Sequence, residues 1–301
     1  MSWTPSDMPD LRGRTAVVTG ANAGLGHEIA AALAAHGAAV VLACRNAERA
    51  EEAVRRIHRR VPDAQVHASA LDLADLTSVA AFADDLRKNH DRLDILVNNA
   101  GLMAIDEART TSGFEMQFGV NHLGHFALTA RLMPLLLHTP GSRVGTMSSI
   151  NHRAARTAIE ADDVPYQRMP AYARSKLANL LFSAELQRRL AAAGASTSSV
   201  AAHPGVAGTE LGTHGTGMMN RLLRATPAWL LQGVATGARP MLRAVTDPSV
   251  RGGQYYGPRF RFYGAPVLET PSKEARDESA ARRLWQLSAE LTGVEPVIAA
   301  Q

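Results

Sequence analysis

The sequence alternates six times between a short apolar run and a longer amphipathic segment, with short connections between them. Short apolar runs bounded by turn residues are typical of buried strands, and this alternation predicts a parallel sheet covered by helices on both faces. The fold class is therefore α/β, with a doubly wound parallel sheet of about seven strands. The strands are expected at 15–19, 38–43, 66–70, 93–97, 143–147, 198–202 and 254–256. Later helices are expected at about 75–89, 113–137, 172–193, 237–245 and 272–292.

Right-handed crossovers place the carboxyl ends of parallel strands at one edge of the sheet, where ligands bind in such folds. Residues able to do chemistry follow this rule and stand at or just beyond the expected strand ends. They are Gly20, Arg45, Asp72, Asn98, Ser148, Ser149 and Pro204. No linker or change of composition divides the chain, so we expect one domain over 1–301, beginning with a loose arm at 1–13.

A tyrosine and a lysine stand four residues apart, at Tyr172 and Lys176, near the start of an expected helix. Residues at this spacing lie on the same helix face. A nearby ammonium favours the phenolate and so lowers a tyrosine pKa, which suits proton transfer near neutral pH. The pair alone is common by chance and is usually a surface pair. Tyr166 is a poorer candidate, because Pro170 stands where its lysine would be.

A glycine-rich turn, Gly20-Ala-Asn-Ala-Gly24-Leu-Gly26, joins the first expected strand to the first helix. Glycines let the backbone turn tightly and approach a phosphate, and the helix start offers amides and a positive dipole end. The spacing differs from the common dinucleotide fingerprint. Its place between strand and helix nevertheless favours a nucleotide site over an ordinary loop.

Taken in order, these motifs identify a resemblance to the short-chain dehydrogenase/reductase family across nearly the whole chain. Segments 117–126 and 175–179 resemble its retinol dehydrogenase and WW-domain oxidoreductase branch, although this chain shows neither an N-terminal anchor nor a WW domain. The resemblance implies a Rossmann-like fold and an enzyme that interconverts an alcohol and a carbonyl by hydride transfer with a nicotinamide cofactor. The motifs are Thr19–Gly26, Asp72, Asn98–Gly101, Asn121, Ser148-Ser149, Tyr172-xxx-Lys176, and Pro204-Gly205 with Thr209.

The same resemblance implies a set of cofactor-binding residues. Asp72 would bind the adenine amino group beside Leu73, and Asn98, Ala100 and Gly101 would line the adenosine ribose. Lys176 would hold the nicotinamide ribose, and Pro204, Val206 and Thr209 would contact the nicotinamide side. The full set is Gly20, Asn22, Gly24, Leu25, Gly26, Arg45, Asp72, Leu73, Asn98, Ala100, Gly101, Tyr172, Lys176, Pro204, Gly205, Val206 and Thr209.

The end of the second strand bears on the choice between NADP(H) and NAD(H). Relatives that prefer NAD carry an acid there, which accepts from the ribose hydroxyls. This chain has Cys44-Arg45 instead, and a guanidinium suits a 2′-phosphate. A solvated arginine is the alternative, and Ala23 supplies no second cation. We expect NADP(H) to be preferred, with NAD(H) as the other candidate.

The resemblance also implies four catalytic residues. Tyr172 would donate or accept the proton, Lys176 would lower its pKa, and Ser149 would stabilise the reacting oxygen. Asn121 would anchor the lysine through water. The rival hypothesis is a nucleotide-binding sensor or scaffold of the same fold without turnover, which would need only the cofactor half of these residues.

Composition limits the other classes of function. The net charge is +4. The densest basic cluster, Arg55 to Arg60, shares a helix with an apolar stripe, which indicates a solvated helix face rather than a nucleic-acid site. The single cysteine, Cys44, excludes an internal disulfide and reads as a buried core residue. No apolar run is long enough for a transmembrane helix, and no signal peptide is apparent. We expect a cytoplasmic protein.

Two further segments keep alternatives open. Residues 206–233 are strongly apolar and would form a lid over a lipophilic substrate, a subunit contact in a homo-oligomer, or a membrane-surface helix. His122 and His125 have a spacing that can bind metal, but no partner ligand is apparent, so a structural role is favoured. His152 is either a pocket residue or an ordinary loop histidine.

Overall fold

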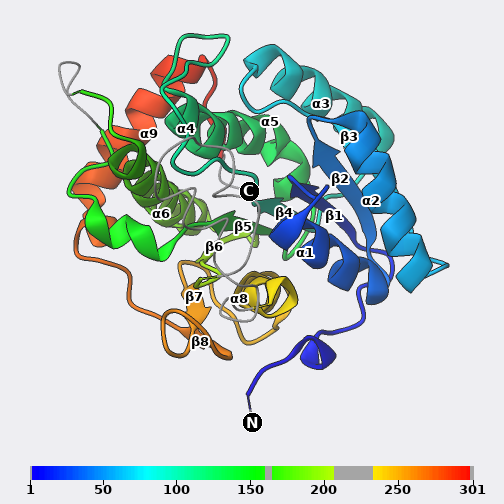
Figure 1. Cartoon of the computed structure of the whole chain (residues 1–301). Coiled ribbons are helices and arrows are strands. Elements are labelled where there is room, and N and C mark those ends of the chain that lie inside the picture. Colours follow the sequence, from blue (N-terminus) through cyan, green and yellow to red (C-terminus); the bar gives the residue numbers. More distant parts are fainter. Residues whose placement is uncertain (1, 160–164, 207–232, 299–301) are drawn as a thin grey trace.

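The computed structural model describes residues 2–159, 165–206 and 233–298. Its centre is a sheet of eight strands in the order β3-β2-β1-β4-β5-β6-β7-β8 (Figure 1). The strands are β1 (Thr15–Thr19), β2 (Ala39–Cys44), β3 (Val66–Ala70), β4 (Ile95–Asn98), β5 (Arg143–Met147), β6 (Ser198–Ala202), β7 (Tyr255–Pro258) and β8 (Pro266–Leu268). All neighbouring pairs are parallel except the last.

Helices cover both faces of this sheet, as the alternating pattern predicts (Figure 1). One face carries α1, α2 and α8 around a core that consists mainly of aliphatic side chains. The other carries α3, α5, α6 and α9, around a core that includes Phe126, Phe182 and Trp285. The main helices are α1 (Gly24–Ala35), α2 (Ala47–Arg60), α3 (Leu76–Asn89), α5 (Gly124–His138), α6 (Arg168–Ala192), α8 (Val234–Thr246) and α9 (Glu278–Thr292).

The strand order reverses direction between β1 and β4, because the chain moves outward to β3 and then returns to pair β4 with β1. In doubly wound sheets a crevice forms at this switch point, beyond the carboxyl ends of the strands. The glycine turn after β1 and the loop after β4 both lie there. The topology therefore positions the site that the sequence predicts.

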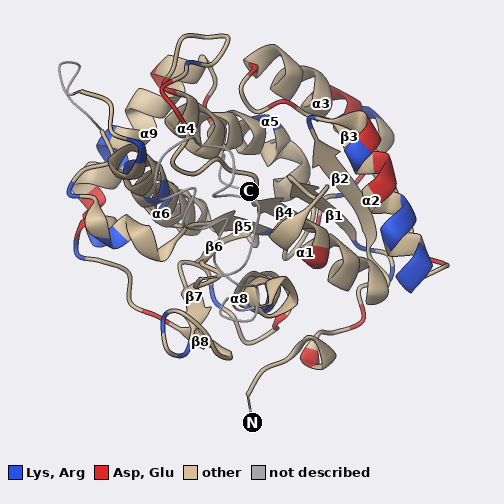
Figure 2. Cartoon of the chain, in the orientation of Figure 1, with Lys and Arg blue, Asp and Glu red and all other residues tan. Residues whose placement is uncertain are grey.

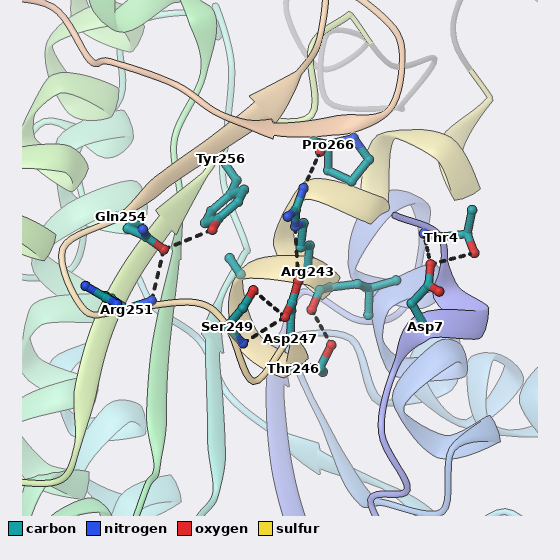
Figure 3. Close-up of polar contacts among 12 residues, drawn as sticks. Thr4, Asp7, Arg243, Thr246, Asp247, Ser249, Arg251, Gln254, Tyr256 and Pro266 are labelled. Atoms are coloured by element: carbon teal, nitrogen blue, oxygen red, sulfur yellow. Dashed lines mark hydrogen bonds and ion pairs between the residues drawn. The ribbon is translucent and has the colours of Figure 1, made fainter. Parts of the chain in front are cut away.

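The expected number of strands, about seven, is one too few. The additional strand, β8, is antiparallel to β7, with Gly257 opposite Val267. It is only three residues long and begins with a proline, so its sequence reads as a loop. Arg243 of α8 fixes it in place by donating to the Pro266 carbonyl at 2.8 Å (Figure 3).

The expectation of a loose N-terminal arm is wrong for the residues described. Trp3, Met8 and Leu11 are buried in the core beneath α1 and α8. Between them a short 3-10 helix, η1 (Pro5–Asp7), is closed by Asp7, which accepts from the backbone and hydroxyl of Thr4 (Figure 3). Apolar burial, together with this cap, orders the arm.

The expected helix at 113–137 begins a few residues later and changes its winding. It consists of α4 (Met116–Phe118), a π-helical turn η2 (Gly119–Leu123) and then α5. A single π turn inside an α-helix is rare and often marks a functional position. Here the π turn carries Asn121.

The basic cluster of α2 lies on an exposed face with acidic neighbours (Figure 2). Arg55 and Arg59 form ion pairs with Glu52, and Arg60 pairs with Glu28 of α1. Among the described helices, none combines the length and hydropathy needed to cross a membrane. Of the expected lid, residues 207–232 lie outside the described residues.

Candidate active site

Tyr172 lies in the first turns of α6 and is almost fully buried, as is Lys176. The Ser149 side chain lies close enough to the Tyr172 hydroxyl to lower the pKa of that phenol. The Lys176 ammonium lies 5.8 Å from the centre of the tyrosine ring. The helix therefore brings the two predicted groups to one buried face, together with the predicted serine.

The expectation that Lys176 lowers the pKa of Tyr172 does not match the structure. Burial raises the pKa of Tyr172 to about 12, and the nearby Ser149 side chain only partly opposes it. Burial also lowers the pKa of Lys176 to about 8. Both charged forms are disfavoured because each side chain is removed from water. Lys176 Nζ donates instead to the Met147 carbonyl at 3.2 Å.

The two adjacent serines have different partners, and these support the choice of Ser149. The Ser148 hydroxyl donates to the Lys176 carbonyl at 2.8 Å, so it fastens β5 to α6. Ser149 caps the short helix η3 (Ile150–Ala154), accepting from the Asn151 amide at 3.2 Å, and its hydroxyl faces Tyr172. Of the two serines, Ser149 is therefore the one beside the Tyr172 hydroxyl.

Asn121 is buried in the π turn and joins the loop after β4 to α6. Its amide donates to the Leu102 carbonyl at 2.9 Å and to Ser175 Oγ at 2.8 Å, and its carbonyl oxygen accepts from the Leu102 amide at 2.7 Å. A Cβ built on Gly101 would lie 3.1 Å from Asn121 Oδ1 and 3.3 Å from Lys176 Nζ. The predicted pair Asn121 and Lys176 therefore lie side by side.

Three observations indicate that the glycine turn can accommodate a phosphate. Gly20 and Gly24 have positive φ angles of 66° and 55°. A Cβ on Gly26 would lie 2.4 Å from the Gly20 carbonyl oxygen, so no larger residue fits. Finally, Ala23 gives α1 no side-chain cap, whereas Asn46 and Asp75 cap α2 and α3 at the same edge of the sheet. The first amides of α1 thus remain available to an anion.

The predicted adenosine-side residues lie around the carboxyl ends of β3 and β4. Asp72 is half-buried and accepts from the Ala74 amide at 2.9 Å, while Leu73 beside it is buried. Asn98 is buried, and its amide donates to Thr129 of α5 at 2.9 Å, which joins the end of β4 to that helix. Ala100 lies against Gly20, close to the turn.

Arg45 is exposed just after β2 and makes no hydrogen bond or ion pair to the described part of the chain. A second guanidinium, which no sequence motif singles out, contacts the glycine turn. Arg56 of α2 donates to the Asn22 carbonyl of the glycine turn at 2.7 Å. The sequence could not single out Arg56, because it stands in a cluster of solvated arginines. Only the packing of α2 against the glycine turn distinguishes Arg56 from its neighbours.

The structure gives His122 and His125 structural roles. His122 is buried among aromatic rings and contacts Ser288 of α9 at 2.7 Å. His125 contacts Thr19 at 2.8 Å, and the Thr19 hydroxyl also accepts from the amides of Asn99 and Ala100. Burial lowers the pKa of both histidines to about 3, so both are neutral. No metal-binding cluster occurs among the described residues.

His152 is fully buried and does not face an open pocket. Its Nδ1 lies 2.7 Å from the Ser149 carbonyl, and its Nε2 accepts from the Ser272 amide at 3.2 Å. Burial lowers its pKa to about 4. Asn179, whose role the sequence does not reveal, donates to the same Met147 carbonyl as Lys176, at 3.0 Å.

On the nicotinamide side, Pro204 and Gly205 follow the end of β6, and Val206 is exposed. Gly205 needs its positive φ of 72°, and a Cβ there would lie 2.3 Å from the Phe262 carbonyl oxygen. Thr209 lies outside the described residues.

Cys44, expected as a core residue, is buried, and burial raises the pKa of its thiol to about 11.

Comparison with known sequences agrees with this arrangement. A family model described as short chain dehydrogenase matches residues 14–217. Human retinol dehydrogenase 13 is 41% identical over 297 residues, which cover 95% of this chain and 86% of that protein. Mouse retinol dehydrogenase 14 is 37% identical over 302 residues, with 94% and 87% covered.

Solved structures agree as well. A protein from Mycobacterium paratuberculosis is 39% identical with a TM-score of 0.82, covering 99% of this chain and 100% of that one. A short-chain dehydrogenase from Escherichia coli CFT073, solved with NADPH, is 25% identical with a TM-score of 0.66, covering 82% and 98%. The chain therefore belongs to the short-chain dehydrogenase family, in its retinol dehydrogenase branch, and is an alcohol and carbonyl oxidoreductase that uses a nicotinamide cofactor.

Proposed function

We propose that this chain interconverts an alcohol and a carbonyl on a lipophilic small molecule, with NADP(H) as its preferred cofactor and Tyr172 as proton donor and acceptor. The observation that carries the proposal is the joint burial of Tyr172, Lys176 and Ser149, with the Lys176 ammonium 5.8 Å from the centre of the Tyr172 ring. The cofactor would supply or accept the hydride. The protein would supply the proton, the orientation and the electrostatics.

In reduction, Ser149 would donate to the carbonyl oxygen and stabilise its developing charge, while Tyr172 would transfer its proton to that oxygen. The raised pKa of Tyr172 favours the protonated phenol at neutral pH, which is the form that reduction requires. Lys176 lies beside Gly101 and Asn121, where it would hold the nicotinamide ribose. In oxidation the same groups would act in reverse.

The surface near Pro204 supports an apolar substrate. Val206, Phe260 and Phe262 each expose about half of their surface, at 41%, 58% and 53%. The Val206 amide donates to the Phe262 carbonyl at 2.9 Å, so they share one corner beside the predicted nicotinamide side. Large exposed apolar side chains that gather at one place are unusual on a soluble surface and favour contact with an apolar ligand.

Arg45 and Arg56 support the cofactor preference. Arg45 is exposed at the end of β2, and Arg56 holds the Asn22 carbonyl of the glycine turn. No carboxylate stands at the end of β2 to accept from ribose hydroxyls. A guanidinium at the end of β2 and another on the glycine turn would attract a 2′-phosphate, which an NAD(H) site would not need.

Replacing Arg45 with Asp tests this preference. We expect the dissociation constant for NADPH to rise about a hundredfold, through loss of a charge-assisted contact and a new repulsion, while that for NADH changes little. Fluorescence titration with both cofactors measures the two constants. Arg251→Asp makes the same charge change in an exposed loop that precedes β7, at the opposite edge of the sheet, and serves as the control. Equal losses for both cofactors in Arg45→Asp would refute the 2′-phosphate contact.

The proposed activity is tested by following NADPH oxidation with aldehydes and ketones of increasing chain length. We expect kcat/KM to rise with apolar length, because each buried methylene contributes about 0.8 kcal/mol. A short, charged carbonyl of equal reactivity serves as the comparison. A preference for the short, charged compounds would contradict the lipophilic substrate, and tight cofactor binding with no turnover would favour the rival sensor hypothesis.

A further inference from the structure

The segment that follows β8, residues 269–274, crosses beside the active site and is here named the strap. Its first residue, Glu269, accepts from His203 Nε2 at 3.0 Å. The His203 and Glu269 side chains are only 1% and 11% exposed, so the pair is shielded from water. None of the motifs recognised in the sequence includes either residue. A buried hydrogen bond to a carboxylate is strong and directional, so it holds the His203 ring in a defined position.

His203 stands directly before the Pro204–Gly205 turn and contacts it. The Gly205 amide donates to His203 Nδ1 at 3.2 Å. An imidazole nitrogen that accepts carries no proton, so the other nitrogen, Nε2, is the one that donates to Glu269. The carboxylate thus selects the tautomer that can hold the Gly205 amide. Loss of the carboxylate would free the ring to adopt the other tautomer, which cannot accept from that amide.

The strap also holds the loop that carries Ser149. Arg153 donates to the Thr270 carbonyl at 2.7 Å and lies 3.8 Å from the Glu269 carboxylate. The Ser272 amide donates to His152, whose other ring nitrogen contacts the Ser149 carbonyl at 2.7 Å. One short segment is therefore bonded both to the serine loop and to the turn after β6.

A buried aromatic ring fills the space between these two attachments. Tyr255 lies edge-on to His152, with ring centres 5.7 Å apart, and is tilted by 30° against His203 at 5.4 Å. It is 3% exposed. Because the two histidines pack on the same ring, their relative position is fixed by contact as well as by the strap.

We infer that His203 and Glu269 are positioning residues that set the Pro204–Gly205 turn against Ser149, and so align the nicotinamide side of the cofactor with the reacting oxygen. This inference rests on the proposed function, because it concerns the same site. Ser149 lies at the end of β5 and the turn at the end of β6, and the strap joins them from the C-terminal part of the chain.

Two substitutions of His203 separate its two contacts. In His203→Asn, the side-chain oxygen can replace Nδ1 as acceptor for the amide two residues on, an ordinary turn for asparagine. In His203→Gln, the longer amide can still donate to Glu269 but no longer holds the Gly205 amide. We expect His203→Gln to weaken NADPH binding and to lower kcat by about tenfold each, and His203→Asn to restore most of the affinity. Equal losses in the two variants would overturn the inference.

Glu269→Ala and Glu274→Ala form a matched pair within the strap. Glu274 pairs with Arg156 and touches neither His203 nor the turn. Nitrogen NMR of the free protein reports the His203 tautomer: we expect protonated Nε2 in the wild type and in Glu274→Ala, and a mixture in Glu269→Ala. NADPH affinity should fall about tenfold only in Glu269→Ala. An unchanged tautomer in Glu269→Ala, or equal loss of affinity in both variants, would refute a positioning role.

These readouts are independent of turnover. If no carbonyl is reduced, the proposed function fails, while the tautomer and the NADPH affinity still decide whether His203 and Glu269 position the turn. If turnover is normal in Glu269→Ala and His203→Gln, the positioning inference fails and the proposed function stands. Melting temperatures of all four variants show whether a loss reflects unfolding.

Discussion

Tyr172→Phe is expected to lower kcat by about a thousandfold while NADPH still binds, because a positioned proton donor contributes roughly a hundredfold to ten-thousandfold. The substitution removes the hydroxyl that contacts Ser149 and leaves the buried ring, so α6 should keep its packing. Steady-state kinetics with a lipophilic aldehyde measures the loss. Turnover close to that of the wild type would disprove the role of Tyr172.

Tyr166→Phe is the matched control, since it makes the same chemical change nearby. Burial raises the pKa of Tyr166 to about 12, as it does for Tyr172, so acidity does not distinguish the two residues. Their contacts do. The Tyr166 hydroxyl donates to the Ile105 carbonyl at 3.0 Å and accepts from Gln117 at 2.8 Å, which leaves it no part in proton transfer. We expect Tyr166→Phe to retain kcat even if it unfolds at a lower temperature.

Lys176→Met is expected to make the protein more stable and nearly inactive. Burial lowers the pKa of Lys176 from 10.5 to about 8, so keeping it charged at pH 7 costs about 3 kcal/mol. Methionine fills a similar volume without a charge. We expect the free energy of unfolding at pH 7 to rise by about 2 kcal/mol, after loss of the Met147 hydrogen bond is counted, while NADPH affinity and kcat both fall.

The stability that Lys176→Met gains over the wild type should depend on pH. Below pH 8 the folded and unfolded states both hold the lysine proton, so the wild type bears the full cost. Above pH 8 the folded state releases the proton first, the unfolded state binds more protons, and wild-type stability rises towards pH 10.5. The gain in Lys176→Met should therefore shrink over that range. Urea unfolding at several pH values measures it, with the exposed Lys88→Met as control. A destabilised Lys176→Met at pH 7 would contradict the account.

Local pattern was enough to predict most of the fold. The strands at 15–19, 66–70, 143–147 and 198–202 have the predicted boundaries, because each is a short run between turn residues. The failures have physical causes. β8 is too short and too rich in proline to show a pattern, and the arm at 1–13 is ordered by long-range burial of Trp3 and Met8.

The π turn at Asn121 was not predictable for a related reason. The apolar spacing of 113–137 is compatible with one uninterrupted α-helix, and one widened turn shifts it too little to detect. The turn is stabilised by contacts from other segments. Asn121 bonds to Leu102 after β4 and to Ser175 of α6, and neither partner is close in sequence.

The residues of the candidate site likewise fall into a group that the sequence could predict and a group that it could not. Tyr172, Lys176, Ser149 and the glycine turn come from motifs that are compact in sequence, and the structure brings them to one edge of the sheet. Arg56, Asn179 and the pair His203–Glu269 act through partners far away in the chain. Sequence alone cannot reveal which solvated arginine or loop histidine makes such a contact. The expected lowering of the Tyr172 pKa was wrong because burial, which the sequence does not show, raises that pKa to about 12.

Transfer of isotope from the cofactor tests the central claim most directly. NADPH carrying two deuterium atoms at the reactive carbon of its nicotinamide is incubated with the protein and a long-chain aldehyde, and the alcohol is analysed by mass spectrometry. The account predicts alcohol with one deuterium on the former carbonyl carbon with the wild-type protein, and almost no alcohol with Tyr172→Phe. An unlabelled alcohol, or no alcohol from any lipophilic carbonyl despite tight NADPH binding, would contradict it.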